Sequence, residues 1–132
     1  MSASNHAESL ILNWLLTTEA VTRPTDWFIG LFDGDPTDAG SSGTEVTTSV
    51  RVAGRVTVTF GASTGGDPAA NTNAVNFGDA ANAVPSVTHF GIFDAGSSGN
   101  LLLSGPLQGQ PLAISAGQPV QFNIGDITVP ID

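Results

Sequence analysis

Three aspartates at short spacing could bind a metal ion. Asp33, Asp35 and Asp38 lie in the stretch DGDPTD, and carboxylates at this spacing resemble the start of an EF-hand calcium loop. The bidentate glutamate of such a loop would fall at Thr44, or at Glu45 with a slip of one residue, and no flanking helices are expected. The same stretch is a strong turn sequence. We therefore predict a turn that needs no ion, and no metal-binding residues.

The other polar residues form no recognisable catalytic group. The two histidines, His6 and His89, are far apart in the chain, and cysteine is absent. No Gly-x-Ser-x-Gly nucleophile turn occurs, and the glycine-rich segment 96–99 lacks the lysine of a phosphate-binding loop. A dispersed carboxylate pair stays open as a minor alternative, because sequence spacing does not fix distance in space. We predict that the protein is not an enzyme and has no catalytic or cofactor-binding residues.

Charge in this chain of 132 residues is scarce and mostly negative. Twelve acidic residues face three arginines and no lysine, for a formal net charge of -9. Such a surface repels nucleic-acid phosphates, so we expect no nucleic-acid partner. Two interpretations stay open: the acidic charge only aids solubility, or an acidic patch meets a basic partner.

The N-terminal segment predicts a helix rather than a membrane span or an export signal. Its longest apolar run, residues 10–16, is interrupted by Asn13 and is far too short to cross a bilayer. The first six residues lack the basic region of a signal peptide. We therefore expect no membrane association, and a protein made and used in a cytosol.

The helix is expected over residues 5–18. Asn5 followed by Glu8 resembles a capping box. A core-facing apolar stripe at helical spacing would consist of Ala7, Leu10, Ile11, Trp14 and Leu15. The only continuous polar stripe is Ser9, Asn13 and Thr17.

Leu12 and Leu16 lie outside the apolar stripe, so the helix is apolar around most of its circumference. We expect its own sheet to cover one side. A neighbouring subunit or loops of the same chain would cover the other, and both alternatives stay open. Leu12 and Leu16, with Trp14, are the predicted partner-binding residues.

After residue 26 the pattern is typical of short strands separated by turns. The fold predicted is mainly β: a two-sheet antiparallel β-sandwich of about seven to nine strands with one N-terminal α-helix packed across one side. A single domain would span 1–132, with the helix in 1–20 and the sandwich in 26–132. The expected strands are 27–32, 55–60, 74–77, 87–93, 101–103, 112–114, 120–124 and 127–131.

The strand around Phe90 carries bulky residues on both faces. Alternation places Phe90 and Ile92 on one face and His89, Gly91 and Phe93 on the other. Both phenylalanines can be buried only if this strand is central and covered on both sides, with the helix expected on one.

Two stretches of the sequence echo each other. Residues 28–33 (FIGLFD) resemble 90–94 (FGIFD), and DAGSSG occurs at both 38–43 and 94–99. We interpret these as two similar core strands, each followed by a glycine-serine loop. Glycines inside the strands would allow close packing or a bulge.

The order of these motifs resembles a family of small tailed-bacteriophage virion proteins commonly described as phage tail-fibre proteins. The resemblance rests on residues 29–32 (IGLF), 35–40 (DPTDAG) and 44–46 (TEV), on Arg55 with 58–60 (VTF), and on 87–95 (VTHFGIFDA) with 99–102 (GNLL). It covers nearly the whole chain. Where the family tends to have a tyrosine two residues before the arginine, this chain has Ala53.

The resemblance implies a structural protein of the virion, made in the bacterial host cytoplasm. It would act as a tail- or fibre-associated subunit or as a capsid-decorating cement subunit. Its partners would be tail, baseplate or capsid proteins, and copies of itself in a homo-oligomer. The alternative is a soluble glycan- or receptor-binding β-sandwich module. The chain has two tryptophans, seven phenylalanines and no tyrosine, a pattern closer to core packing than to a sugar-binding platform.

Overall fold

The computed structural model describes residues 2–130. The elements in chain order are β1 (Ser2–Ala3), α1 (Asn5–Leu16), β2 (Phe28–Asp33), β3 (Thr44–Glu45), α2 (Thr47–Val50), β4 (Val56–Thr57), β5 (Ala69–Ala70), β6 (Val75–Asp79), β7 (Val84–Val87), β8 (His89–Phe93), β9 (Leu101–Pro106), β10 (Leu112–Ile114), β11 (Pro119–Phe122) and β12 (Thr128–Val129). Residues 1, 131 and 132, which the expected ranges include, lie outside the described part, and the single-domain organisation stays a prediction.

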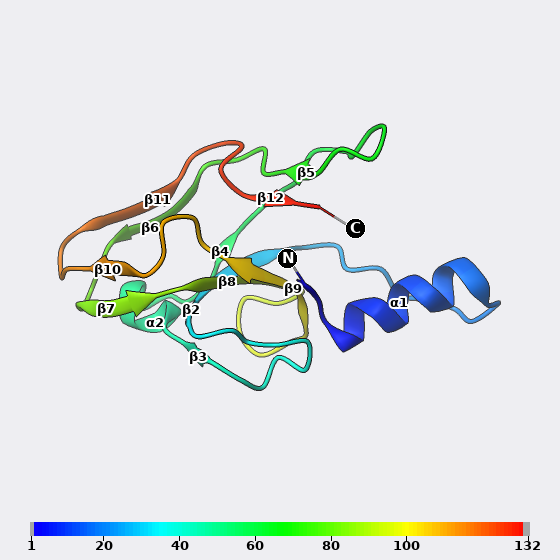
Figure 1. Cartoon of the computed structure of the whole chain (residues 1–132), viewed down its shortest axis with the longest axis horizontal. Helices are drawn as coiled ribbons and strands as arrows, with labels where there is room; N and C mark the ends of the chain where they lie inside the picture. The colour runs from blue at the N-terminus through cyan, green and yellow to red at the C-terminus, as the bar shows by residue number, and fades with distance from the viewer. Residues whose placement is uncertain (1, 131–132) are drawn as a thin grey trace.

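The body is an antiparallel β structure of two layers (Figure 1). One layer is a six-stranded sheet in the order β1-β9-β8-β2-β3, with β4 also paired to β2. The other layer consists of three two-stranded ladders: β10-β7, β11-β6 and β12-β5. The mainly β fold with an N-terminal helix is confirmed, although the second layer is three separate ladders rather than one continuous sheet.

The main core lies between the two layers. Ile29 and Leu31 of β2 face it beside Phe90 and Ile92 of β8, because the antiparallel register pairs Ile29 with Ile92 and Leu31 with Phe90. The ladders supply the other half of the core, which includes Val75, Phe77, Val84, Val87, Ile114, Val120, Ile127 and Val129. Core strands β2, β6, β8, β10 and β11 therefore overlap the expected strands 27–32, 74–77, 87–93, 112–114 and 120–124.

Most differences from the expected strands concern short elements. The run 87–93 forms two strands, β7 and β8, which are separated at Thr88. The expected strand 55–60 is reduced to β4 and an isolated bridge between Phe60 and Asn71. The two-residue strands β1, β3 and β5 and the one-turn helix α2 were not predicted, because segments this short carry too little periodicity to be recognised.

Strand β8 is central, between β9 and β2, as its two bulky faces require. Phe90 is buried in the main core, and Phe93 is buried on the opposite face with Phe32 and Leu101. The rings of Phe32 and Phe93 stack with centroids 6.0 Å apart. Contrary to expectation, the helix meets this second face only at its start, where Asn5 and His6 line a hollow with Phe93 and Leu101. The side chain of Arg55 lies over the Phe93 ring, with its Cζ 3.3 Å from the ring centroid.

Helix α1 starts at Asn5 as predicted, but its N-cap is one residue earlier than predicted. The N-cap is Ser4, whose Oγ accepts a hydrogen bond from the backbone N–H of Ala7 at 3.1 Å. The expected capping box of Asn5 and Glu8 is therefore wrong. Ser4 takes the role because its own N–H donates to the carbonyl of Leu102 at 2.9 Å and its hydroxyl donates to the carbonyl of Leu101. These long-range bonds to β9 are not visible in a local sequence pattern.

The expectation that α1 packs across the sheet is also wrong. Figure 1 shows the helix extending away from the body, and within it only Ala7 is buried. Its first turn is fixed at the sheet edge by the bonds of Ser4 and by a 2.9 Å bond from the Asn5 N–H to the carbonyl of Asp38. The remaining turns therefore have no sheet beneath them. Within residues 2–130, no helix is long and apolar enough to cross a membrane.

Candidate interaction surface

The projecting part of α1 presents the largest group of exposed apolar side chains in the described structure. The three predicted partner-binding residues are all exposed: Leu12 by 55%, Trp14 by 73% and Leu16 by 75%. Ile11 and Leu15 are exposed as well, so these two residues and Trp14 do not face the core as the apolar stripe predicted. We call these five residues the α1 apolar surface. Outside α1, the large exposed apolar residues of the described part are Val52 and Ile124.

This surface carries no formal charge of its own. From Ser9 to Leu16 the sequence is SLILNWLL, and the nearest acidic residue of the helix is Glu8 in its first turn. The chain as a whole has a net charge of -9. A second protein can therefore approach the α1 apolar surface without meeting the acidic charge directly. A contiguous exposed apolar surface of this kind is typical of a protein–protein contact.

Both ends of the helix are ordered by hydrogen bonds. At the C-terminal end the N–H of Thr17 donates to the carbonyl of Asn13 at 3.2 Å, and the Thr17 hydroxyl donates to the same carbonyl at 2.8 Å. The Thr17 hydroxyl oxygen also accepts from the N–H of Glu19 at 3.1 Å. Satisfying the backbone groups at each end stabilises a helix that has little packing along its length.

Residues of both copies of DAGSSG lie near the base of α1, but the two copies make different contacts. In the first copy the Asp38 carbonyl accepts from Asn5 at the helix start, and its carboxylate accepts from the hydroxyl of Ser2. In the second copy the Asp94 carboxylate accepts two bonds from Asn100, from its backbone N–H at 2.7 Å and its side chain at 2.8 Å. Residues of both loops line one hollow with Ser4, Asn5 and His6. The first copy is therefore hydrogen-bonded to the base of the helix, whereas the second is closed by its own bonds beside it.

Asp94 is held in its charged form by these contacts. Burial acts to raise the pKa of its carboxyl, but the hydrogen bonds from the side chain and backbone of Asn100 and the charge of His6 outweigh burial. The net effect lowers the pKa of Asp94 below its ordinary value. The Asp94 carboxylate that accepts both bonds from Asn100 is therefore ionised at neutral pH.

The motif residues Glu45, Arg55 and Phe93 meet on the outer face of the six-stranded sheet. Arg55 donates to both carboxylate oxygens of Glu45, from Nε to Oε1 at 2.9 Å and from Nη2 to Oε2 at 2.8 Å. Its Nη1 donates to the carbonyls of Ala95 at 3.0 Å and Ser98 at 2.8 Å. These bonds tie β3, β4 and the loop after β8 together. The cluster is a structural brace, since its charged groups are fully engaged with one another.

Glu45 stays ionised in this cluster. Burial acts to raise the pKa of its carboxyl, but hydrogen bonds from Arg55 and from Thr47 and the charge of Arg55 outweigh burial, and the pKa is lowered. The Thr47 hydroxyl donates to Glu45 Oε1 at 2.9 Å and accepts from the N–H of Leu31, also at 2.9 Å. Sequence reasoning matched Glu45 and Arg55 to family motifs but missed their pairing.

The other polar residues considered from sequence are not brought together. Asp35 Oδ1 accepts from the N–H of Thr37 at 2.8 Å, the bond of an aspartate-initiated turn. His89 Nδ1 lies 2.8 Å from the hydroxyl of Thr88 at the start of β8, whereas His6 lies on α1. In residues 2–130 no group of three His, Cys, Asp or Glu side chains is arranged to hold a metal ion.

Comparison with known proteins gives one family. A family model described as "Podophage GP4 fiber I protein gp80" matches residues 2–130 of the chain. A search of curated proteins finds no match. The matched range includes α1, the Glu45–Arg55–Phe93 cluster and both DAGSSG loops.

Proposed function

The chain belongs to the podophage GP4 fiber I protein gp80 family, and on this basis we propose that it is a non-enzymatic structural subunit of a tailed-phage virion. Its role is that of a tail- or fibre-associated or capsid-decorating subunit that works through protein–protein contacts. The observation that carries this proposal is the α1 apolar surface, which is exposed and uncharged on a helix fixed to the body at its base.

Burial of this surface supplies enough free energy for a stable contact. Fully burying a leucine, isoleucine or methionine-sized side chain contributes about 1.5–3 kcal/mol, and tryptophan is among the residues most enriched at energetic centres of interfaces. A short amphipathic helix that lies in an apolar groove is a common mode of recognition. We propose that Leu12, Trp14 and Leu16 are the central contacts.

The partners are other virion proteins and further copies of the chain in a homo-oligomer. An acidic body favours a partner groove whose rim is basic, because complementary charge steers two proteins together. Copies of the chain repel one another through their bodies at a net charge of -9. The α1 apolar surface, which carries no formal charge, is where this repulsion is weakest.

The experiment is particle incorporation of the double variant Leu12→Ser with Leu16→Ser. Since both side chains are more than half exposed, the variant should keep the melting temperature of the parent and lose incorporation into particles and any homo-oligomer. Val52→Ser, which changes an isolated exposed apolar residue, is the matched control and should incorporate normally. A folded double variant that incorporates at the parental copy number would overturn the proposal.

A further inference from the structure

Strand β1 and helix α1 form an N-terminal arm (residues 2–16) that closes one edge of the six-stranded sheet. β1 lies antiparallel to β9, with Ser2 opposite Ser104 and Ala3 opposite Leu103. Because β9 is the last strand of the body on this side, its backbone groups here are paired by the arm. An unpaired strand edge is a template for another chain. The same segment of a second copy would therefore fit this edge in the same register.

The contacts between the arm and the body are concentrated at the start of the arm. After β1 come the backbone bonds of Ser4 and Asn5 to the body, and Ala7 is the one buried residue of α1. No residue from 8 to 26 is buried. We call residues 2–7 the arm latch, because they hold the arm to the body while the rest of α1 projects.

An exposed segment, residues 17–27, joins the far end of α1 to β2. Figure 1 shows the chain returning from that end toward the body. Within residues 2–130, the hydrogen bonds of residues 18–26 are local and none reaches the body. A segment of this length spans up to about 36 Å, whereas the 12-residue helix is about 18 Å long. The segment is therefore long enough to carry the arm to a neighbouring body.

From these observations we propose that the N-terminal arm is exchanged between two copies of the chain, so that each arm latch binds the β9 edge of the other copy. This inference rests on the homo-oligomer of the proposed function and names how its two copies are joined. Exchange keeps every contact of the arm latch, because both copies offer the same groups to it. Exchange of an identical element therefore makes a dimer with few new contacts.

The exchanged form covers the α1 apolar surface. Each α1 projects from the body that its latch binds toward the body to which residues 17–27 connect it, so the two helices run antiparallel between the bodies. Leu12, Trp14 and Leu16 are exposed in the single chain and pack against the other helix in the dimer. Removal of this apolar area from water stabilises the exchanged form over the closed one.

The same arrangement keeps the acidic bodies apart. Each chain has a net charge of -9, so direct contact between two bodies is opposed by repulsion. A 12-residue helix between them separates them by about 18 Å, more than the screening length of about 8 Å at physiological ionic strength. The exchanged dimer therefore joins two acidic bodies with little repulsion between them.

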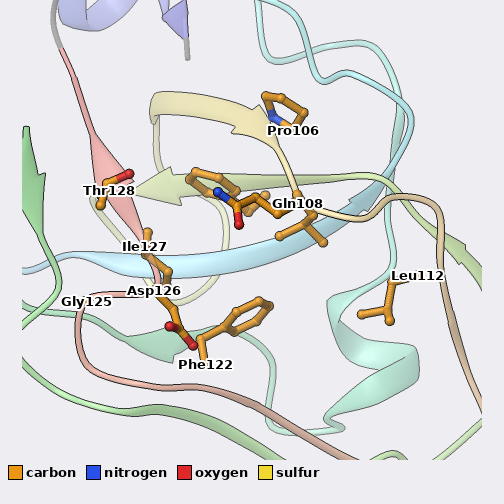
Figure 2. Close-up of a pocket in the computed structure, with 10 residues that line it drawn as sticks. Pro106, Gln108, Leu112, Phe122, Gly125, Asp126, Ile127 and Thr128 are labelled. Carbon is orange, nitrogen blue, oxygen red and sulfur yellow. The ribbon is translucent and has the colours of Figure 1, made fainter.

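The largest hollow of the body is a poorer site for α1 of another copy. It has a volume of about 480 Å³, and its lining residues, all within residues 2–130, include Phe122 and Asp126 but no basic residue. Figure 2 shows Asp126 beside Phe122. An apolar helix packed on Phe122 would remove the Asp126 carboxylate from water without a compensating cation, which is unfavourable. The pairing of two α1 surfaces buries no such charge.

The test is a disulfide that reports which chain each arm latch binds. The parent has no cysteine, so Ser2→Cys with Ser104→Cys places the only two thiols at opposed positions of β1 and β9. The Cα atoms of opposed antiparallel residues lie about 4.5–5.5 Å apart, within the range of about 4.4–6.8 Å that a disulfide spans. Equal amounts of unlabelled and ¹⁵N-labelled full chain are refolded together from urea at high protein concentration and then oxidised.

Exchange predicts disulfide-linked peptides in which one half is labelled and the other is not, because such a peptide must come from two chains. It also predicts a covalent dimer on a non-reducing gel. A closed arm gives a monomer band and peptides with the same label in both halves. Dilution of the refolding mixture should lower the mixed-label fraction, because exchange depends on protein concentration.

Asp33→Cys with Thr44→Cys is the matched control. These two exposed residues are opposed in the β2-β3 pair, which belongs wholly to the body, so their disulfides should carry one label only. Ala3→Cys with Leu103→Cys is the neighbouring register pair of β1 and β9. It repeats the test at a second position and replaces the first pair if the buried Ser104 does not accept a cysteine.

The role of the paired helices is tested by adding Leu12→Ser with Leu16→Ser to the Ser2→Cys, Ser104→Cys chain. The arm latch is unchanged in this variant, but the apolar helix contact is lost. The mixed-label fraction should therefore fall toward that of the control. An equal fraction with and without the leucine changes would overturn the helix pairing.

Mixed-label peptides from both β1-β9 cysteine pairs that are no more frequent than in the body control would overturn arm exchange. Sedimentation of the parent then separates this failure from that of the proposed function. An oligomer whose disulfides all lie within single chains leaves the proposed homo-oligomer standing with other contacts. A parent that sediments as a monomer at every concentration removes the homo-oligomer as well.

Discussion

Arg55 lies flat against Phe93, with its guanidinium carbon 3.3 Å from the ring centroid, while its nitrogens hold Glu45 in a two-pronged ion pair. The Arg55 side chain is only 7% exposed. Arg55 thereby covers the Phe93 ring on the outer face of the central strand β8. The stability of the outer face of the sheet therefore depends on this ion pair as well as on apolar packing.

Arg55→Ala should be strongly destabilising. It removes the cover from Phe93, leaves the Glu45 carboxylate without its partner, and leaves the carbonyls of Ala95 and Ser98 without their donor. Breaking a buried ion pair by removing one partner costs about 3–5 kcal/mol, and partial exposure of Glu45 places the expected loss near the lower end. Urea denaturation measures it. Arg23→Ala, at an exposed position before β2, should change the free energy of unfolding by less than about 0.5 kcal/mol.

The same pair predicts how stability depends on pH. The pKa of Glu45 is lowered from its ordinary value of 4.5 in the folded state, so between the folded and unfolded values the unfolded chain binds more protons. Stability from this group is fully present above pH 4.5 and is lost as the pH falls below it through the folded pKa. Glu45→Gln should flatten this part of the profile in thermal melts between neutral and acid pH.

The control for the pH experiment is Glu19→Gln, which removes an exposed carboxylate that forms no ion pair within residues 2–130. Its melting temperature should fall in acid as steeply as that of the parent. If the Glu45→Gln protein shows the parental slope, the Glu45–Arg55 pair does not carry the acid sensitivity.

Gly91→Ala should lower stability because the strand has no room for a methyl group there. A Cβ on Gly91 would lie 2.9 Å from Leu101 Cδ1 and 3.0 Å from ring atoms of both Phe32 and Phe93. Overpacking of this kind costs about 1–3 kcal/mol. Gly61→Ala is the comparison, since its nearest contact would be Thr72 Cγ2 at 3.4 Å. Equal melting temperatures for the two variants would show that the Phe32–Phe93 cluster can move aside.

The paired glycines of β2 and β8 were predicted only in part from the sequence. The repeated strand motif predicted close packing at its glycines, and the two copies do pair, with Gly30 opposite Gly91 in the β2-β8 register. A Cβ on Gly30 would lie 2.8 Å from Glu45 Oε1. Gly30 therefore leaves the space in which the ion pair sits, whereas Gly91 leaves space for the Phe32, Phe93 and Leu101 side chains. The motif predicted close packing at its glycines but did not identify the Glu45–Arg55 pair, because these two residues come together only through tertiary folding.

Helix α1 was predicted from the sequence, but its contacts were not. Its apolar periodicity correctly predicted a helix, but periodicity identifies which side chains are apolar and not what they contact. The direction of α1 is set by backbone bonds from Ser4 and Asn5 to residues 102 and 38, and these distant partners leave no local sequence signal. Leu12 and Leu16 were nevertheless predicted as partner contacts from sequence, because they lie outside the apolar stripe that one sheet can cover.

Trp14 provides a direct optical test of the α1 apolar surface. The chain has two tryptophans, Trp14 on α1 and Trp27 before β2, so Trp27→Phe leaves Trp14 as the only indole. Because Trp14 is 73% exposed, its emission should be that of a water-exposed indole in dilute protein and should be quenched by acrylamide. On assembly into particles or a homo-oligomer, the emission should shift to shorter wavelength and quenching should fall, because water leaves the ring. Adding Leu12→Ser with Leu16→Ser should abolish both changes, since they remove its apolar neighbours. An emission maximum that is unchanged on assembly of the Trp27→Phe protein would mean that the contact lies elsewhere on the chain.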